Sequence, residues 1–239
     1  FRDTTGQWHP IPEFSGYLQG AQHATVRDFL DVSADTMWIA TDGSGVLAYR
    51  PGDAHPRKID HDAAIDSSLP GDAVRALLHD RAGNVWVATD LGLARTYPGA
   101  RSAFAVLPSP LEQNTLSDTS VRSVYVDSRG LIWIGLGSGR IDMIDLKAGH
   151  MTHLQLGGSQ IHRDIQSFVE AADGSIWVGT QGLARIDPVT LAIRPSILPE
   201  LENVPVLSLQ RDGNRLLIGT YDGLYRYDIG AGVLDHIKH

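Results

Sequence analysis

The sequence has no cysteine, which excludes disulfide bridges, thiolate metal sites and cysteine nucleophiles. It also has no apolar run near the roughly 18 residues that a membrane-spanning helix requires. Basic residues are scarce, because 20 Lys and Arg stand against 28 Asp and Glu and give a net charge of −8. A role in binding duplex nucleic acid is therefore disfavoured, since such proteins usually carry a basic surplus. What is present is a chain of 239 residues, 42% of them apolar, which is enough to bury a core.

An internal repeat dominates the chain. Five segments combine a short apolar run with a small residue and then a Gly-containing turn, and four of the five place Thr directly after the small residue. The anchor residues of these segments are Trp38, Trp86, Trp133, Trp177 and Leu217. Ala or Gly lies two positions after each anchor, which indicates close approach between neighbouring units. A near-constant spacing of this length is typical of stacked structural repeats.

Each unit is predicted to form four short strands separated by turns. The first strands are expected to begin at Val26, Val74, Val121, Ile165 and Val206. Residues 73–79 favour a helix by propensity alone. Their equivalent, 121–126, is rich in β-branched and aromatic residues, and equivalent positions of a repeat share a backbone, so a strand is predicted.

Four antiparallel strands per unit of this length are typical of a β-propeller blade. The sequence therefore predicts an all-β protein, a single β-propeller domain or part of one. Its five blades are expected at approximately 24–60, 73–108, 120–156, 164–198 and 205–239.

The first twelve residues resemble only the end of a unit, so 1–12 is predicted to be a lone outer strand. The fifth unit already has its own fourth strand, so a closed five-bladed ring would contain one strand too many. We expect that the chain is part of a ring of six or more blades. The alternative is that the spare strand pairs with a partner chain.

Three segments resemble a known repeat family. GNVWVAT at 83–89, GSIWVGT at 174–180 and GLARIDP at 182–188 are similar to the two-component regulator propeller repeat. In that repeat a D-G-x-[IL]-W-[IV]-G-T strand is followed by a G-L-x-R-[YF]-D-P strand. The chain departs from this pattern at Leu136, Arg140 and Leu217.

The resemblance implies a propeller of about seven blades that serves as the periplasmic or otherwise extracytoplasmic sensor of a membrane-anchored signal-transduction receptor. The receptors concerned are hybrid histidine kinases or nucleotide cyclases of the GGDEF type, and they commonly sense carbohydrates. The implied partners are the remainder of the receptor chain and a second copy of the chain. The resemblance implies no catalytic residue and no cofactor in this part of the receptor.

The residue after the opening apolar position of each first strand is a candidate ligand contact. In a propeller these strands line the axis, so Arg27, Arg75, Arg122 and Gln166 are expected around one mouth of the channel. Guanidinium groups suit carboxylate, sulfate or sugar hydroxyl groups. The alternative is structural: each guanidinium pairs with a neighbouring carboxylate such as Asp28 or Asp118.

Aromatic side chains in the variable loops before the first strands, or near the same mouth, are candidates for stacking on a sugar ring. These residues are Phe14, Tyr17, His23, His162 and Tyr221. The predicted ligand-binding set is Arg27, Arg75, Arg122, Gln166 and Tyr221.

Other chemistry is weakly represented. The Gly-rich segment 135–140 looks like a phosphate cradle, but it aligns with a hairpin in the other repeats and is predicted to be one. His150 and His153 would point to opposite faces of a strand, which disfavours a shared metal ion. We therefore expect a non-catalytic sensor for a carbohydrate or another small anionic or polar ligand, with no metal and no cofactor. A protein-interaction scaffold and a propeller lyase remain the alternatives.

Overall fold

A computed structural model gives the fold and describes residues 25–53, 55–100, 102–156, 164–195 and 197–237. The predicted outer strand at 1–12 lies outside the described residues. Five four-stranded antiparallel sheets are formed, and within each sheet the strands follow one another in chain order. Among the described residues the one helix is the short 3₁₀ turn η1 (Pro199–Leu201), and no helix is long and apolar enough to cross a membrane.

The strands of the five sheets have the following bounds. The first sheet contains β1 (Thr25–Ser33), β2 (Thr36–Asp42), β3 (Val46–Tyr49) and β4 (Arg57–Ile59). The second contains β5 (Val74–His79), β6 (Val85–Thr89), β7 (Gly92–Thr96) and β8 (Phe104–Val106). The third contains β9 (Val121–Val126), β10 (Ile132–Leu136), β11 (Arg140–Asp145) and β12 (His150–Gln155). The fourth contains β13 (Ser167–Glu170), β14 (Ile176–Thr180), β15 (Gly182–Ile186) and β16 (Ile193–Arg194). The fifth contains β17 (Val206–Asp212), β18 (Arg215–Thr220), β19 (Gly223–Asp228) and β20 (Val233–Ile237).

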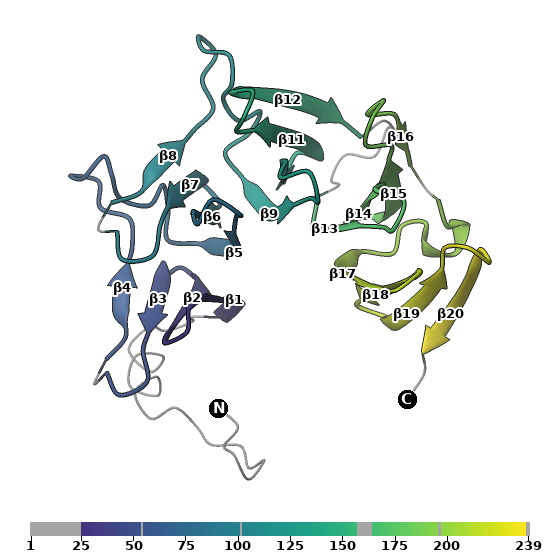
Figure 1. Cartoon of the computed structure of the whole chain (residues 1–239), viewed down its shortest axis with the longest axis horizontal. Coiled ribbons are helices and arrows are strands. Elements are labelled where there is room, and N and C mark those ends of the chain that lie inside the picture. The colour runs from purple at the N-terminus through teal and green to yellow at the C-terminus, as the bar shows by residue number, and fades with distance from the viewer. Residues whose placement is uncertain (1–24, 54, 101, 157–163, 196, 238–239) are drawn as a thin grey trace.

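The sheets are the blades of a β-propeller, as predicted. Figure 1 shows them side by side in an arc around a common centre, with β1, β5, β9, β13 and β17 innermost and the last strand of each blade outermost. The first and fifth blades lie at the two ends of the arc. Residues 74–79 form strand β5, so tertiary context overrides the helix propensity of this segment.

Burial follows the position of a strand within its blade. The second strands β6, β10 and β14 are buried at every residue, because both faces of these strands are covered by neighbouring blades. The outermost strands are short or exposed, as in β4, β8 and β16. The hydrophobic core therefore lies in the boundaries between blades.

Each Trp anchor packs on the blade that follows it. Trp133 lies 6.4 Å from Phe168 between ring centroids, and Trp177 lies 5.7 Å from Tyr227. Trp86 joins a cluster with Val121 of the third blade. The anchors thus link consecutive blades by burying large aromatic surfaces.

The small residue two positions after the anchor marks the closest approach of two blades. A Cβ atom added to Gly179 would come within 2.8 Å of Val206 Cγ1 in the next blade and 2.4 Å of Ser167 Oγ. A Cβ added to Gly135 would meet Ile165 at 2.6 Å. The predicted reason for a small residue, contact between blades, is confirmed at these two positions.

The fourth blade begins its first strand later than expected. Ile165 was predicted to open this strand, but β13 begins at Ser167. The Ile165 backbone N–H donates to the Leu136 carbonyl of the third blade at 3.2 Å, and Gln166 N–H donates to the Gly179 carbonyl at 2.9 Å. The backbone at Ile165 thus connects two blades before the regular pairing of β13 with β14 begins.

Candidate functional site at the propeller axis

The residues that open the first strands converge at the centre of the arc. A cavity of about 790 Å³ lies there, lined by residues from all five blades. All five predicted ligand-binding residues contribute to its wall: Arg27, Arg75, Arg122, Gln166 and Tyr221. The structure therefore brings together side chains that are up to 194 positions apart in the sequence numbering.

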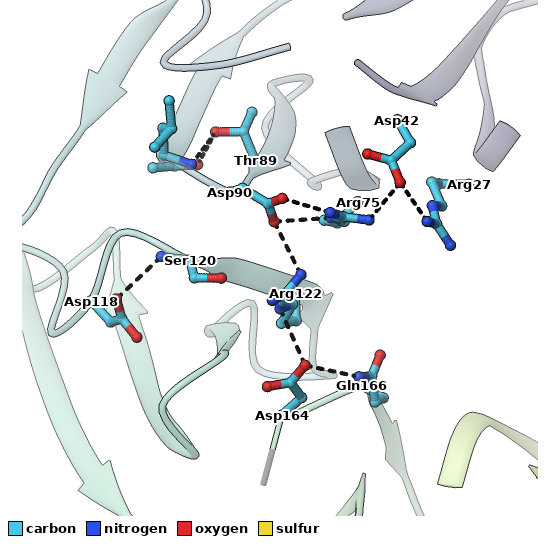
Figure 2. A network of polar contacts seen from close by, with 12 residues as sticks. Arg27, Asp42, Arg75, Thr89, Asp90, Asp118, Ser120, Arg122, Asp164 and Gln166 are labelled. Carbon is cyan, nitrogen blue, oxygen red and sulfur yellow. Dashed lines mark hydrogen bonds and ion pairs between the residues drawn. The ribbon is translucent and has the colours of Figure 1, made fainter. Parts of the chain in front are cut away.

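Arg75 is the centre of a chain of ion pairs along this wall (Figure 2). Its Nε and Nη2 donate to the two carboxylate oxygens of Asp90 at 2.9 and 2.5 Å, which is a bidentate arrangement. Its Nη1 donates to Asp42 Oδ2 at 3.0 Å. Arg27 donates to the same Asp42 oxygen from the first blade. The Arg75 side chain is 19% exposed, so these contacts are partly shielded from water.

The chain of ion pairs continues into the third and fourth blades. Arg122 Nη1 donates to Asp90 Oδ1 at 3.1 Å, and its Nε lies 3.4 Å from Asp164 Oδ2. Gln166 Nε2 donates to the same Asp164 oxygen at 3.4 Å. Figure 2 shows the resulting succession of alternating cationic and anionic groups, which we call the axial ladder. Its members are Arg27, Asp42, Arg75, Asp90, Arg122, Asp164 and Gln166.

The acidic members of the axial ladder were missed by sequence reasoning. Asp42 is the last residue of β2 and Asp90 follows the last residue of β6, and each comes directly after a Thr, so a T-D pair in the first two repeats was the available signal. The third repeat has Gly137 at this position, and Asp164 supplies the carboxylate from the loop before the fourth blade instead.

The structural alternative, pairing with carboxylates, is confirmed for the three arginines, but the named partners were wrong. Asp28 accepts the Leu77 backbone N–H at 2.8 Å, and Asp118 accepts the Ser120 backbone N–H. Both carboxylates therefore serve the backbone of adjacent chain segments rather than the guanidinium groups. Burial raises the pKa of Asp28 above its ordinary value, although the hydrogen bonds from the backbone N–H groups of Leu77 and Phe29 oppose this shift.

The electrostatics of the axial ladder are nearly balanced. The hydrogen bond from Arg27, with the positive charge of Arg75, lowers the pKa of Asp42 below its ordinary value although burial opposes this shift. The hydrogen bonds that Arg75 donates to Asp90 in turn raise the pKa of Arg75. Three arginines pair with three aspartates, so the positive charges of the guanidinium groups that line the cavity are balanced by carboxylates beside them.

The opposite side of the cavity is less polar. Leu207 and Leu209 of the fifth blade and Phe168 of the fourth line it. Tyr221 stands at this side with 81% of its surface exposed, so its ring is open to a ligand. The cavity therefore combines a polar wall with an apolar and aromatic one.

The other candidate groups do not form a second centre. The Gly-rich segment 135–140 is a hairpin between β10 and β11, as predicted. His153 Nδ1 contacts Asp142 Oδ1 at 2.7 Å, while His150 is exposed. Across the part of the chain that the structure describes, no group of three potential ligands could hold a metal ion. Phe14, Tyr17, His23 and His162 lie outside the described residues.

Comparison with known proteins supports the repeat assignment. The profile of the two component regulator propeller matches residues 68–90, 115–138 and 159–182. A search of curated proteins gave no match.

Many solved structures share the fold. The extracellular domain of a proposed one-component system from B. thetaiotaomicron is 23% identical with a TM-score of 0.72, over 90% of this chain and 28% of that one. The extracellular domain of a proposed hybrid two-component system from the same organism is 18% identical with a TM-score of 0.74, over the same shares. The chain thus spans about a quarter of the length of these two structures.

An enzyme is also similar in fold. Virginiamycin B lyase from Staphylococcus aureus, in an inactive H270A form with quinupristin, is 12% identical with a TM-score of 0.69. The match covers 98% of this chain and 75% of the lyase. This likeness concerns the propeller fold alone. Three segments of the chain thus match the two-component regulator propeller, and the described residues fold as five blades of a β-propeller.

Proposed function

We propose that the chain is a non-catalytic sensor module of a signal-transduction receptor, located outside the cytoplasm, and that its axial cavity binds a carbohydrate. The carrying observation is the cavity of about 790 Å³, into which the opening residues of all five blades converge. The repeat family and the extracellular domains of similar fold support a receptor context. The remainder of the receptor chain is the proposed partner.

The chemistry of the cavity wall favours a neutral polar ligand over an anion. An anionic ligand would have to displace a carboxylate from each guanidinium group, because all three arginines are already paired. Hydroxyl groups can instead donate to carboxylate oxygens and accept from guanidinium N–H groups without breaking the pairs. This narrows the expectation of an anionic or polar ligand to a polyhydroxylated one.

The aromatic and apolar side of the cavity suits the other face of a sugar. The C–H face of a pyranose ring is apolar, and it packs on aromatic rings while its hydroxyl groups point to polar partners. Tyr221 offers such a ring in the wall of the same cavity, to which Leu207 of the fifth blade also contributes. A ligand held between the two walls would contact the early and the late blades at once.

The axial ladder provides a route from ligand to output. Its ion pairs cross the boundaries between blades, as in the contact of Arg75 with Asp42. A ligand that binds one arrangement of these pairs more tightly than another shifts the balance between the two arrangements. A change in blade packing can then reach an output domain elsewhere in the receptor.

The test is binding of a panel of neutral and acidic oligosaccharides to the intact receptor ectodomain, measured by thermal shift and then calorimetry. We expect a neutral oligosaccharide to raise the melting temperature. Tyr221→Ala and Arg122→Gln should each weaken its binding by ~10-fold or more. Arg226→Gln, which removes an exposed ion pair of the fifth blade with Asp235, is the matched control and should bind as the wild type does. No shift with any carbohydrate would overturn the ligand assignment.

A further inference from the structure

A second hollow lies between the first and second blades, at the other end of strand β2 from the axial ladder. Asp42 of the ladder is the last residue of β2, whereas Thr36, at its start, lines this hollow. The hollow has a volume of about 450 Å³. Trp38 and Ala48 contribute to its wall, together with Pro98 and Gly99 of the second blade. We refer to it as the Trp38 hollow.

The hollow exists because the first blade has a small residue where the other blades have a long one. In each blade the anchor pairs in register with one residue of the third strand, and in the first blade Trp38 pairs with Ala48. The equivalent partners in the next three blades are Arg95, Met143 and Arg185. Arg95 and Arg185 place their guanidinium carbons 5.9 and 5.8 Å from the centres of the Trp rings that they cover. Ala48 is too short to cover Trp38 in this way.

The indole N–H of Trp38 also lacks the carboxylate acceptor that the equivalent Trp has in the second and third blades. In the second blade Trp86 Nε1 donates to Asp80 Oδ2 at 2.8 Å, and in the third blade Trp133 Nε1 donates to Asp127 Oδ2 at 3.1 Å. Both aspartates lie six positions before their Trp, and the first blade has Val32 at this position. Within the described ranges Trp38 Nε1 donates no hydrogen bond, and Trp177 Nε1 of the fourth blade is likewise without a partner. The Trp38 side chain is 2% exposed, and it borders the hollow.

Cationic groups surround the mouth of the hollow. Arg50 and Arg57 both line it, and Asp53 is the one acidic side chain among its described lining residues. Arg50 Nε donates to Thr36 Oγ1 at 2.8 Å, which leaves its remaining N–H groups available. Arg57 forms no ion pair with another described residue. The local charge therefore favours an anion.

We propose that the Trp38 hollow binds a small carboxylate with a compact apolar body. The carboxylate accepts the Trp38 indole N–H in the place that the Asp80 carboxylate takes in the second blade, with the guanidinium groups of Arg50 and Arg57 beside it. The apolar body covers Trp38 in the place of the Arg95 stem. The second and third blades thus supply from their own side chains an acceptor for the indole N–H and a cover for the Trp ring. In the first blade the ligand supplies both. This site is independent of the axial cavity and of its proposed ligand.

The test uses benzoate as the probe and benzamide as its uncharged equivalent. The ¹⁵N–¹H resonances of the five indole groups resolve the tryptophans one by one, and Trp38→Phe assigns the resonance of interest. Benzoate should shift the Trp38 resonance downfield with a saturable dependence and a Kd of ~1 mM or below, as hydrogen bonding to a carboxylate requires. Benzamide should shift it less, and the Trp86 and Trp133 resonances should not move.

Filling the hollow is the decisive variant. Ala48→Met places in the first blade the side chain that the third blade carries, and it should weaken benzoate binding by ~10-fold or more while the chain stays folded. Arg50→Gln should also weaken binding, whereas Arg226→Gln should not. Val32→Asp should shift the Trp38 resonance without any ligand, because it restores the acceptor of the other blades. An unmoved Trp38 resonance at saturating benzoate, or unchanged binding in Ala48→Met, would overturn the proposal.

Discussion

Arg75 of the second blade donates a hydrogen bond of 3.0 Å to Asp42 of the first blade, while it holds Asp90 of its own blade with two further bonds. A single guanidinium group therefore connects two blades at the axis. The same pattern recurs one blade later, where Arg122 contacts Asp90. Polar contacts at the centre thus supplement the aromatic contacts of the Trp anchors further out.

Replacing Arg75 with Gln should destabilise the fold by ~1–3 kcal/mol, because Asp42 and Asp90 lose their shared partner in a partly buried site. The free energy of unfolding in urea measures this cost. Arg226→Gln is the control, since its ion pair with Asp235 is exposed and should contribute less than about 1 kcal/mol. Equal costs for the two variants would contradict a special role of Arg75.

The contribution of Asp42 to stability should depend on pH. Its pKa is lowered in the folded chain, chiefly by the hydrogen bond from Arg27, relative to an ordinary value of 3.8. Stability gained from a lowered pKa is present above the ordinary value and is lost as pH falls through the folded-state value.

Asp42→Asn should therefore cost stability at about pH 7 and cost less at about pH 3. Urea unfolding at the two pH values gives the comparison. Asp212→Asn replaces an exposed carboxylate of β17, and its effect should be small at both. A cost of Asp42→Asn that stays constant with pH would speak against the ion pairs.

The three covered Trp anchors should respond differently to Phe. Trp86 and Trp133 each donate an indole N–H to an aspartate, whereas Trp177 Nε1 is buried without a partner, with Ala171 in place of the aspartate. Trp86→Phe and Trp133→Phe should thus lose ~1–2 kcal/mol more than Trp177→Phe, beyond the shared loss of volume. Thermal or urea unfolding of the three variants measures the difference, and a Trp177→Phe cost as large as the others would refute it.

The small residues after the anchors provide a further test. Gly179→Ala should destabilise by ~1–3 kcal/mol, because its Cβ would press on Val206 of the next blade. Gly219 occupies the same position in the fifth blade, where an added Cβ comes closer than 3.5 Å only to Ser208 Oγ. Gly219→Ala should cost less, since a hydroxyl group can rotate away. Unfolding free energies that rank the two variants in the reverse order would show that blade contact is not the constraint.

The blades could be predicted from the sequence because the repeat shows the same pattern of strands and turns in five separate segments. The Trp strand is buried on both faces in the second, third and fourth blades, and this follows from its apolar sequence. The convergence of Arg27, Arg75 and Arg122 follows from the same periodicity, because equivalent positions of a propeller blade face the same axis.

The partners of these arginines could not be predicted in the same way. Asp42 and Asp90 lie at the ends of second strands. The direction in which their side chains point depends on the backbone conformation where each strand leaves its sheet. Asp164 replaces the missing carboxylate of the third repeat from a different segment altogether, so no alignment of repeats reveals it. Pairing of this kind depends on tertiary geometry rather than on local pattern.

The fifth blade differs from the fourth in how well its apolar side chains are covered. Leu217 replaces the Trp, and Leu224 is 38% exposed whereas its equivalent Leu183 is 1% exposed. The apolar surface of this face is thus open in the described part of the chain.

Sharing carboxylates between blades limits how the array can be rearranged. Each of Asp42 and Asp90 is held from one side by an arginine of its own blade and from the other by an arginine of the blade that follows. The first two blades each bring an arginine at the start and an aspartate at the end of the second strand, so a copy of the second blade placed after the original would again meet an aspartate with an arginine. The third blade has Gly137 where these aspartates lie, so a blade placed after it would need Asp164 in its preceding loop to continue the alternation of charges.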